Sequence, residues 1–271
     1  MPKERVAPLY RPAMELYGAK KLILVLSISE FKYQFLGSYL GAVWAVLRPL
    51  IFVLVIWFIF STGFKNSQAA NGTPFILYLL TGYLPWMFFS EAISGGMNSI
   101  LNNSFLVKKV GFKIQILPLV KIASAFYLHA VFMIVMILML IGHGYYPNLY
   151  WLQLPFYILC LTLLLVGLGW LTASLRLFTK DISEVVAIGL QIGFWVSPIF
   201  WSIGMIPEKY HWIISLNPMA YIINGYRDTF INNAWFWESA GLTAYLVTSF
   251  IFLLLGITVF KRLKPHFLDV L

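Results

Sequence analysis

Four long stretches of this chain contain no charged side chain, and they limit the fold more than any other feature. No Asp, Glu, Lys or Arg occurs in residues 66–90, 122–175, 185–207 and 239–260. A helix that spans a bilayer needs about 20 apolar residues, so the run 122–175 has room for two such helices. A transmembrane β-barrel would show short segments of alternating polarity instead. The pattern predicts an all-α polytopic membrane protein that forms a single transmembrane domain over residues 1–271.

The composition agrees with a membrane protein and argues against a nucleic-acid partner. Hydrophobic residues make up 61% of the chain and charged residues 11%, against about 45–50% and about 25% in soluble domains. The net charge is +9, but the basic residues stand between the apolar runs, which is how a membrane protein sets its orientation. We therefore expect contact with membrane lipids and none with nucleic acid. The single cysteine, Cys160, leaves the redox compartment undefined.

The distribution of Lys and Arg predicts the topology. Sixteen of them fall in one set of alternate connecting regions and three in the other. Because cytoplasmic segments carry the excess of positive charge, six spans with both termini in the cytoplasm are expected. The six spans cover about residues 40–61, 74–92, 114–142, 151–175, 185–205 and 239–260.

Three segments outside the spans have a predicted role in the architecture. Residues 15–35 place several apolar side chains on one side of a helix, with Leu22, Leu26 and Tyr33 outside that side. This moderate pattern favours an interfacial helix, although a cytoplasmic extension of the first span is an alternative. Residues 98–111 form a basic cytoplasmic segment. Residues 206–237 are too polar to span and too apolar for an exposed loop, so two short helices hinged at Asn217-Pro218 are expected. They form an external re-entrant hairpin or an interfacial cap anchored by tryptophans.

The chain lacks the motifs of several enzyme classes. No Gly-x4-Gly-Lys-Ser/Thr pattern occurs, so no ATP site of that kind is expected. The four histidines lie in different segments without metal-ligand spacing, and His129 in the third span is expected to be a packing hydrogen-bond group. We predict no catalytic residue, no metal and no cofactor in this chain.

Aromatic side chains are abundant, with ten Trp, 15 Tyr and 23 Phe. One cluster lies in the first span, where Gly37, Gly41, Trp44, Arg48 and Phe52 recur at helical spacing on one face. Another cluster lies in the fifth span. Its members are Phe194, Trp195, Phe200 and Trp201. Aromatic faces stack on the C–H faces of sugars without requiring a charge, so such clusters favour a neutral polymer over an ion.

Five stretches together resemble the membrane subunit of polysaccharide ABC exporters, the Wzm-like type-2 permeases that export O-antigen, capsule or teichoic acid. They are SEFKYQFLGSYLGAVWAVLRPL, TGYLPWMFFSEAI, NNSFLVKKVGFKIQILPL, FTKDISEVV and LNPMAYIINGYRD. The resemblance extends over nearly the whole chain. The family commonly has Phe-Pro where this sequence reads Phe112-Lys113.

The resemblance implies a transport subunit in the bacterial cytoplasmic (inner) membrane that moves a lipid-linked polysaccharide, most simply O-antigen. Two copies of this chain would assemble with two copies of an ATP-binding cassette subunit, which would hold ATP and Mg²⁺. The polymer would follow an aromatic-lined path at the homodimer interface between first and fifth spans.

The resemblance also implies roles for individual residues. The path would be lined by Trp44, Phe52, Phe194, Trp195, Phe200 and Trp201. Contacts at the entrance with the lipid diphosphate would come from Lys32, Leu36, Gly37 and Arg48. Docking on the ATPase would involve Asn98, Asn102, Lys108 and Lys109. For Lys32, snorkelling to anionic lipid is an equal alternative.

Two other functions fit the same topology. A permease of a drug or lipid ABC exporter shares the six spans and the missing P-loop. A membrane-embedded glycosyl- or acyltransferase would need acidic or histidine side chains that face a cavity.

Overall fold

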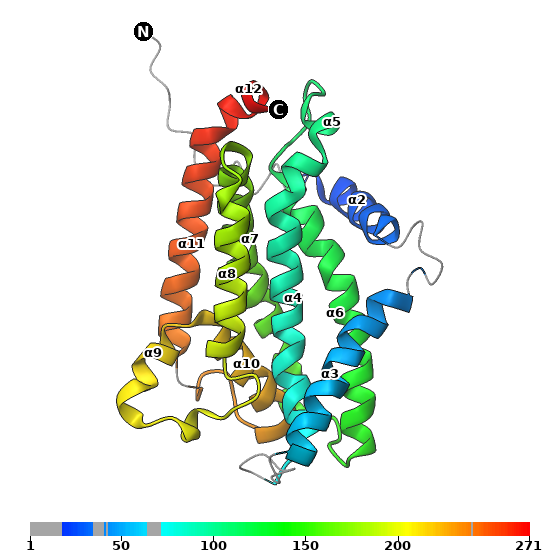
Figure 1. The fold of residues 1–271 in the computed structure, drawn as a ribbon, viewed down its shortest axis with the longest axis vertical. Coiled ribbons are helices and arrows are strands. Elements are labelled where there is room, and N and C mark those ends of the chain that lie inside the picture. The colour runs from blue at the N-terminus through cyan, green and yellow to red at the C-terminus, as the bar shows by residue number, and fades with distance from the viewer. Residues whose placement is uncertain (1–17, 35–40, 42, 64–71, 240) are drawn as a thin grey trace.

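The computed structural model describes residues 18–34, 41, 43–63, 72–239 and 241–271, and this part of the chain is all-helical. The long helices run side by side along the long axis of the molecule, while α2, α5 and α12 lie at one end and α9 and α10 at the other (Figure 1). The main helices are α2 (Lys20–Tyr33), α3 (Val43–Gly63), α4 (Phe75–Asn102), α5 (Ser104–Val107), α6 (Ile116–Gly142), α7 (Leu154–Phe178), α8 (Asp181–Val196), α9 (His211–Ser215), α10 (Pro218–Arg227), α11 (Leu242–Leu263) and α12 (Phe267–Val270). Short 3₁₀ or π turns are η1 (Leu149–Gln153), η2 (Ile203–Met205), η3 (Glu208–Tyr210), η4 (Asp228–Asn232) and η5 (Lys264–His266).

Four helical segments of the described chain are long and apolar enough to cross a membrane. They are Phe75–Asn102, Ile116–Gly142, Leu149–Phe178 and Leu242–Val270. They contain the predicted second, third, fourth and sixth spans, and they agree with a multi-pass membrane protein. The apolar part of α3 is shorter, Val46–Ile59, and α8 has 16 residues. The count of six spans therefore stays a prediction.

The predicted fifth span, 185–205, is not one continuous helix. The helix α8 begins earlier, at Asp181, and ends at Val196. Ser197 then has extended backbone angles, φ −75° and ψ 142°. The cause is Pro198, whose ring disfavours the helical conformation of the residue before it. The chain continues without regular structure until η2.

The cytoplasmic segment predicted at 98–111 is partly a continuation of the second span. The helix α4 runs ten residues beyond the predicted end at 92, to Asn102, and only Ser104–Val107 forms a separate helix. The polar residues of this stretch placed it outside the second span, as a short separate helix, but Ser99 is fully buried on the side of α4 that packs in the bundle. Small polar residues are tolerated there because they let neighbouring helices approach closely.

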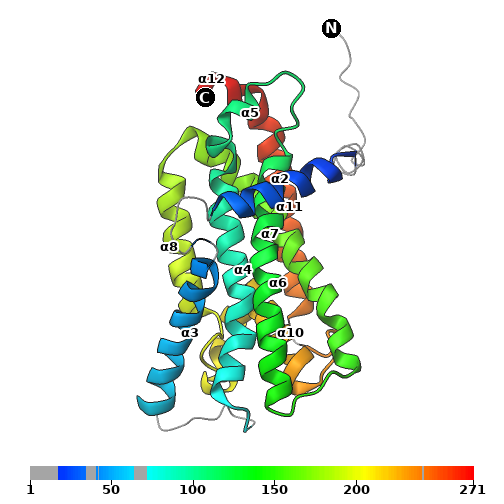
Figure 2. The ribbon, with the colours of Figure 1, turned by 90° about the vertical axis from the view of Figure 1, so that its right-hand side faces the viewer.

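The helix α2 is bound to the side of α6. It crosses the bundle rather than following its long axis (Figure 2), which favours an interfacial helix over a straight extension of the first span. The Glu30 carboxylate pairs with Lys121 of α6, and the Ser27 hydroxyl is 2.9 Å from the Tyr127 hydroxyl. Leu24, on the predicted apolar side, is exposed and therefore available to lipid.

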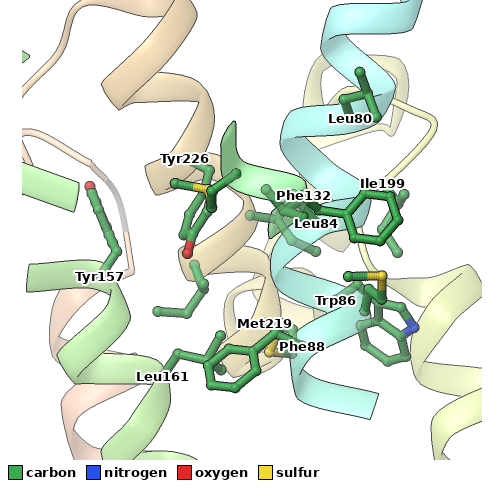
Figure 3. Close-up of a cluster of buried hydrophobic side chains, with 14 of the residues drawn as sticks. Leu80, Leu84, Trp86, Phe88, Phe132, Tyr157, Leu161, Ile199, Met219 and Tyr226 are labelled. Atoms are coloured by element: carbon green, nitrogen blue, oxygen red, sulfur yellow. The ribbon is translucent and has the colours of Figure 1, made fainter. Parts of the chain in front are cut away.

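Two short helices were predicted within residues 206–237, and the structure has α9 and α10 there. The break between them lies at Asn217-Pro218, as expected. The helix α10 begins at Pro218, and the Asn217 side chain accepts a hydrogen bond from the Met219 backbone N–H. Most of α10 is buried against α4, α7 and α11. Figure 3 shows Tyr226 of α10 in the same apolar cluster as Leu84, Phe132 and Tyr157.

The helices α7 and α11 touch backbone to backbone. A Cβ atom added at Gly256 would lie 2.2 Å from the Gly167 carbonyl oxygen, and one added at Gly167 would lie 2.6 Å from the Leu253 nitrogen. Close approach through small residues is a main source of helix association in membranes, where lipid tails remove the hydrophobic drive. This contact fixes the position of the last long helix.

Replacement of Gly256 by valine is expected to separate α7 from α11. Because the added atoms would meet backbone, the free energy of unfolding should fall by about 1–3 kcal/mol. The matched control is Gly142→Val at the end of α6, where an added Cβ meets nothing within 4 Å. Thermal unfolding of the two purified variants checks the difference, and equal melting temperatures would contradict the close contact.

Candidate functional site

A cavity of about 560 Å³, here called the polar cavity, lies between the end of α2, the first half of α3 and α4. It brings together three residues that the sequence singled out, Trp44, Arg48 and Phe52. The Arg48 guanidinium carbon lies 5.8 Å from the centre of the Trp44 ring. The remaining wall is formed by Gln34, Gly41, Pro49, Tyr83, Met87, Ser90, Glu91 and Leu128. The cavity therefore combines a cation, a carboxylate and aromatic faces.

Lys32, also predicted at the entrance, is not among the described residues that line this cavity. Lys32 is exposed in the last turn of α2. Leu36 and Gly37 lie outside the described residues. Only Arg48 of that predicted group is placed at the cavity by the structure.

A series of aromatic rings joins the two clusters that the sequence placed in separate spans. Phe52 of α3 stacks on Tyr83 of α4 with ring centres 5.1 Å apart, and Phe194 of α8 lies 5.9 Å from Phe52. Phe194 in turn lies 5.5 Å from Trp195 and 5.0 Å from Phe200. We call Phe52, Tyr83, Phe194, Trp195 and Phe200 the ring series.

Two members of α4 were missed by the sequence reasoning. Tyr83 links Phe52 to Phe194, and Trp86 lies 5.9 Å from Phe194. Both occur in the stretch TGYLPWMFF. They lie on the α4 side that faces α3 and α8, a relation that follows from packing and not from local spacing.

A second cavity, of about 450 Å³, lies where α8 ends and is called the outer cavity. Trp195 and Trp201 line it, and the Trp201 indole N–H donates to the Trp195 carbonyl oxygen at 3.2 Å. The other lining residues are Val196, Met205, Ile206, Tyr210, Ile213 and Ile214. Trp195 is 60% exposed, whereas Phe200 is 7% exposed and packs in the hydrophobic core.

A buried arginine holds the irregular segment after α8 against α4. Arg227, at the end of α10, is 3% exposed. Its guanidinium carbon lies 3.6 Å from the centre of the Tyr78 ring, and an Nη2–H donates to the Ile199 carbonyl oxygen at 2.9 Å. The Tyr78 hydroxyl donates to the Trp201 carbonyl oxygen at 2.9 Å. A Cβ atom added at Gly82 would lie 2.8 Å from Arg227 Nη2, so only glycine leaves room here.

The charge on this arginine persists despite its burial. Desolvation by burial lowers the pKa of Arg227 to about 10, and the neighbouring Tyr78 and Asp228 oppose the shift. The group is therefore protonated at neutral pH. A charge in such a place needs partners, and the Tyr78 ring and the Ile199 carbonyl supply them. Sequence reasoning did not single out Arg227.

The residues predicted to dock on the ATPase lie at one end of the bundle. Asn102, Lys108 and Lys109 are exposed, while Asn98 is half-buried and donates to the Ser94 carbonyl oxygen of its own helix. The Lys108 ammonium donates to the Leu271 backbone oxygen at 3.0 Å.

Two apolar side chains that the sequence reasoning missed stand beside these lysines. Phe105 of α5 and Val110, just after that helix, are both exposed, and α5 lies at one end of the molecule (Figure 1). We call Phe105, Lys108, Lys109 and Val110 the α5 tip. Exposed apolar residues flanked by cations are suited to contact with another protein.

Potential metal-binding side chains do not gather in the part of the chain that the structure describes. Within the described residues, no group of three or more His, Cys, Asp or Glu side chains could hold a metal ion. His129 Nε2 is 3.0 Å from the Tyr226 hydroxyl, so this histidine packs α6 against α10 as expected.

Comparisons with known proteins agree on one family. Residues 21–231 match the family described as ABC-2 type transporter. The chain is similar to the O-antigen export system permease protein RfbA of Klebsiella pneumoniae, with 30% identity over 92% of this chain and 95% of that protein. It is also similar to RfbA of Myxococcus xanthus, with 23% identity over 96% and 98% of the two chains. The polysialic acid transport protein KpsM of Escherichia coli is 22% identical over 89% and 93%.

Two substitutions of Tyr78 separate its hydroxyl from its ring. Tyr78→Phe removes the bond to the Trp201 carbonyl and is expected to lower the free energy of unfolding by about 1 kcal/mol. Tyr78→Leu also removes the ring under the Arg227 guanidinium, which adds about 2 kcal/mol for a desolvated cation–π contact. Thermal unfolding of the purified variants measures both values. An equal loss in the two variants would show that the ring does not hold the arginine.

Proposed function

The chain belongs to the ABC-2 type transporter family, and on this premise we propose that it is the membrane-spanning subunit of an ATP-driven exporter of a lipid-linked polysaccharide, with O-antigen as the polysaccharide. It is a transport subunit and not an enzyme. The relatives named as O-antigen permeases align with it over almost their whole length, which supports the substrate class. The membrane concerned is the bacterial cytoplasmic (inner) membrane.

The single observation that carries the proposal is that the ring series has members in both cavities, Phe52 and Tyr83 in the polar cavity and Trp195 in the outer cavity. The polar cavity contains Trp44 and Phe52, the outer cavity contains Trp195 and Trp201, and the ring series lies between them. A neutral polymer of sugars can exchange one ring contact for the next without a large desolvation cost, because no charge has to be removed from water. An ion path would need polar ligands along this stretch instead.

The proposed topology has six spans, with α3 and α8 added to the four long apolar helices. A helix of 16 residues is about 24 Å long, less than the roughly 30 Å of a hydrocarbon core. The irregular segment from Ser197 to Trp201 would complete the fifth crossing. Such a backbone is tolerated at membrane depth where protein covers it or it lines a wet cavity, and Ile199 is covered by the Arg227 contact.

Within this topology the hairpin of α9 and α10 dips into the outer leaflet and the α2 helix lies on the inner surface. Arg48 then stands near the cytoplasmic headgroups, where a cation attracts a lipid diphosphate. Lys32 is exposed in the last turn of α2, and on the inner surface its charge suits anionic lipid as well as substrate.

The proposed assembly contains two copies of this chain and two copies of an ATP-binding cassette subunit. ATP and Mg²⁺ belong to that partner, and this chain carries no P-loop pattern. The α5 tip is the proposed docking surface, with Asn98 and Asn102 behind it on α4. The exposed Trp195 and the exposed side of α3 would face the partner copy along the polymer path.

Loss of this chain is expected to stop export without stopping synthesis. A strain that lacks its gene should accumulate the lipid-linked glycan inside the cell, and immunoblotting of surface and internal fractions measures the distribution. Complementation with the intact gene is the control. Normal surface glycan in the deletion strain would refute the proposed function.

Removal of the Arg48 guanidinium is expected to lower export and leave assembly intact. Arg48→Ala deletes the cation of the polar cavity, and a charged hydrogen bond is worth about 1.5–3 kcal/mol, so the rate at limiting substrate should fall about tenfold or more. Lys261→Ala, an exposed cation at the end of α11, serves as the control. Copurification with the ATPase should be unchanged in both variants. Unaltered export by Arg48→Ala would show that this residue only anchors the helix to lipid headgroups and does not contact the substrate.

A further inference from the structure

Glu91 is an acidic residue to which the proposed polymer path assigns no role. It is the only Asp or Glu within α3, α4, α6, α7 and α11. It is exposed in the wall of the polar cavity, on the same cavity surface as Arg48. Neither side chain forms an ion pair with any residue that the structure describes, where the pairs are Lys121–Glu30 and His266–Asp269. The cavity wall thus carries a carboxylate and a guanidinium, neither of which is ion-paired within the described residues.

The chemistry of the surrounding groups limits what this carboxylate can bind. An ionised carboxylate accepts hydrogen bonds and donates none, and it repels a phosphate. The Ser90 hydroxyl donates to the Met87 carbonyl oxygen at 3.1 Å, so its lone pairs are left to accept. Gln34 adds an amide to the same wall. The wall formed by Ser90 and Glu91 is therefore suited to a ligand rich in hydroxyl donors.

The Trp44 ring supplies the third part of the arrangement. It lies in the same cavity, with Arg48 near its face. A sugar ring presents apolar C–H faces and equatorial hydroxyls, so it can stack on an aromatic face while its hydroxyls reach a carboxylate. A ligand that places a phosphate at Arg48 and hydroxyl groups at Glu91 satisfies both charges at once.

We propose that the polar cavity is a sugar-phosphate site in which Glu91 accepts hydrogen bonds from hydroxyls of the sugar next to the lipid diphosphate, while Arg48 holds the phosphate and Trp44 the sugar face. Glu91 then distinguishes a glycosylated carrier lipid from the bare carrier. This assignment rests on the proposed function, because it identifies the part of the lipid-linked polysaccharide that the polar cavity recognises. It adds selectivity that an aromatic path alone lacks.

The test compares two labelled probes on the complete transporter in lipid nanodiscs. One probe is a polyprenyl diphosphate that carries a single glucose, and the other is the same polyprenyl diphosphate without sugar. Glu91→Ala should weaken binding of the glycosylated probe about tenfold or more, as expected for the loss of charged hydrogen bonds, and leave binding of the bare probe unchanged or tighter, because the removed carboxylate repels a phosphate. Arg48→Ala should weaken both probes.

Two further variants keep the result interpretable. Glu91→Gln retains one acceptor oxygen without the charge and should give an intermediate loss for the glycosylated probe. Glu184→Ala removes an exposed acid in the first turn of α8, outside the cavity, and should change neither probe.

Three outcomes would overturn the assignment. Unchanged binding of both probes by Glu91→Ala would remove Glu91 from recognition. Tighter binding of both would show that it only repels the diphosphate. An equal loss of affinity for both probes, together with a lower melting temperature of the complex, would show that Glu91 stabilises the position of Arg48 and does not recognise the sugar. In each case the export defect of the deletion strain is a separate result, so the proposed function can survive the failure of this site.

Discussion

The contacts of the buried Arg227 guanidinium hold together the end of the molecule where α8 ends and α10 lies. The guanidinium lies on the Tyr78 ring of α4 and donates to the Ile199 carbonyl, in a segment where no helix satisfies the backbone. Pro198 breaks the helix there, and an unsatisfied carbonyl in an apolar region is costly. The arginine removes that cost and joins α4, α10 and the end of α8. The position of the outer cavity follows from this one group.

The polar cavity at the other end uses charge differently. Arg227 has an aromatic face and a carbonyl as partners, whereas Arg48 and Glu91 are exposed and have no ion-pair partner in the described chain. Groups whose charge is satisfied within the protein hold the fold, and groups left open to a cavity are free for a ligand. The ring series connects the two regions through side chains that bind without charge.

The sequence predicted the helical class, the long spans and the hinge at Asn217-Pro218 because each rests on local chemistry. Charge-free length, a proline that lacks an N–H and the spacing of apolar residues act within one segment. The helices differ from the predicted bounds at two places, the end of α8 and the end of α4. In the first case Pro198 keeps Ser197 out of the helix, and in the second α4 continues past the predicted end with Ser99 buried.

The candidate site likewise contains some residues that local sequence predicted and others that only tertiary packing brings to it. Trp44, Arg48 and Phe52 were predicted together, because helical spacing puts them on one face of α3. Tyr83, Arg227 and Glu91 acquire their roles only from other helices: a ring between two spans, a guanidinium over a ring, and a carboxylate that lines the same cavity as a cation. By itself, the sequence determined that this chain is an all-helical membrane protein with aromatic spans. The tertiary structure decided which rings meet and which charges stay free, because those contacts join residues that are far apart in the chain.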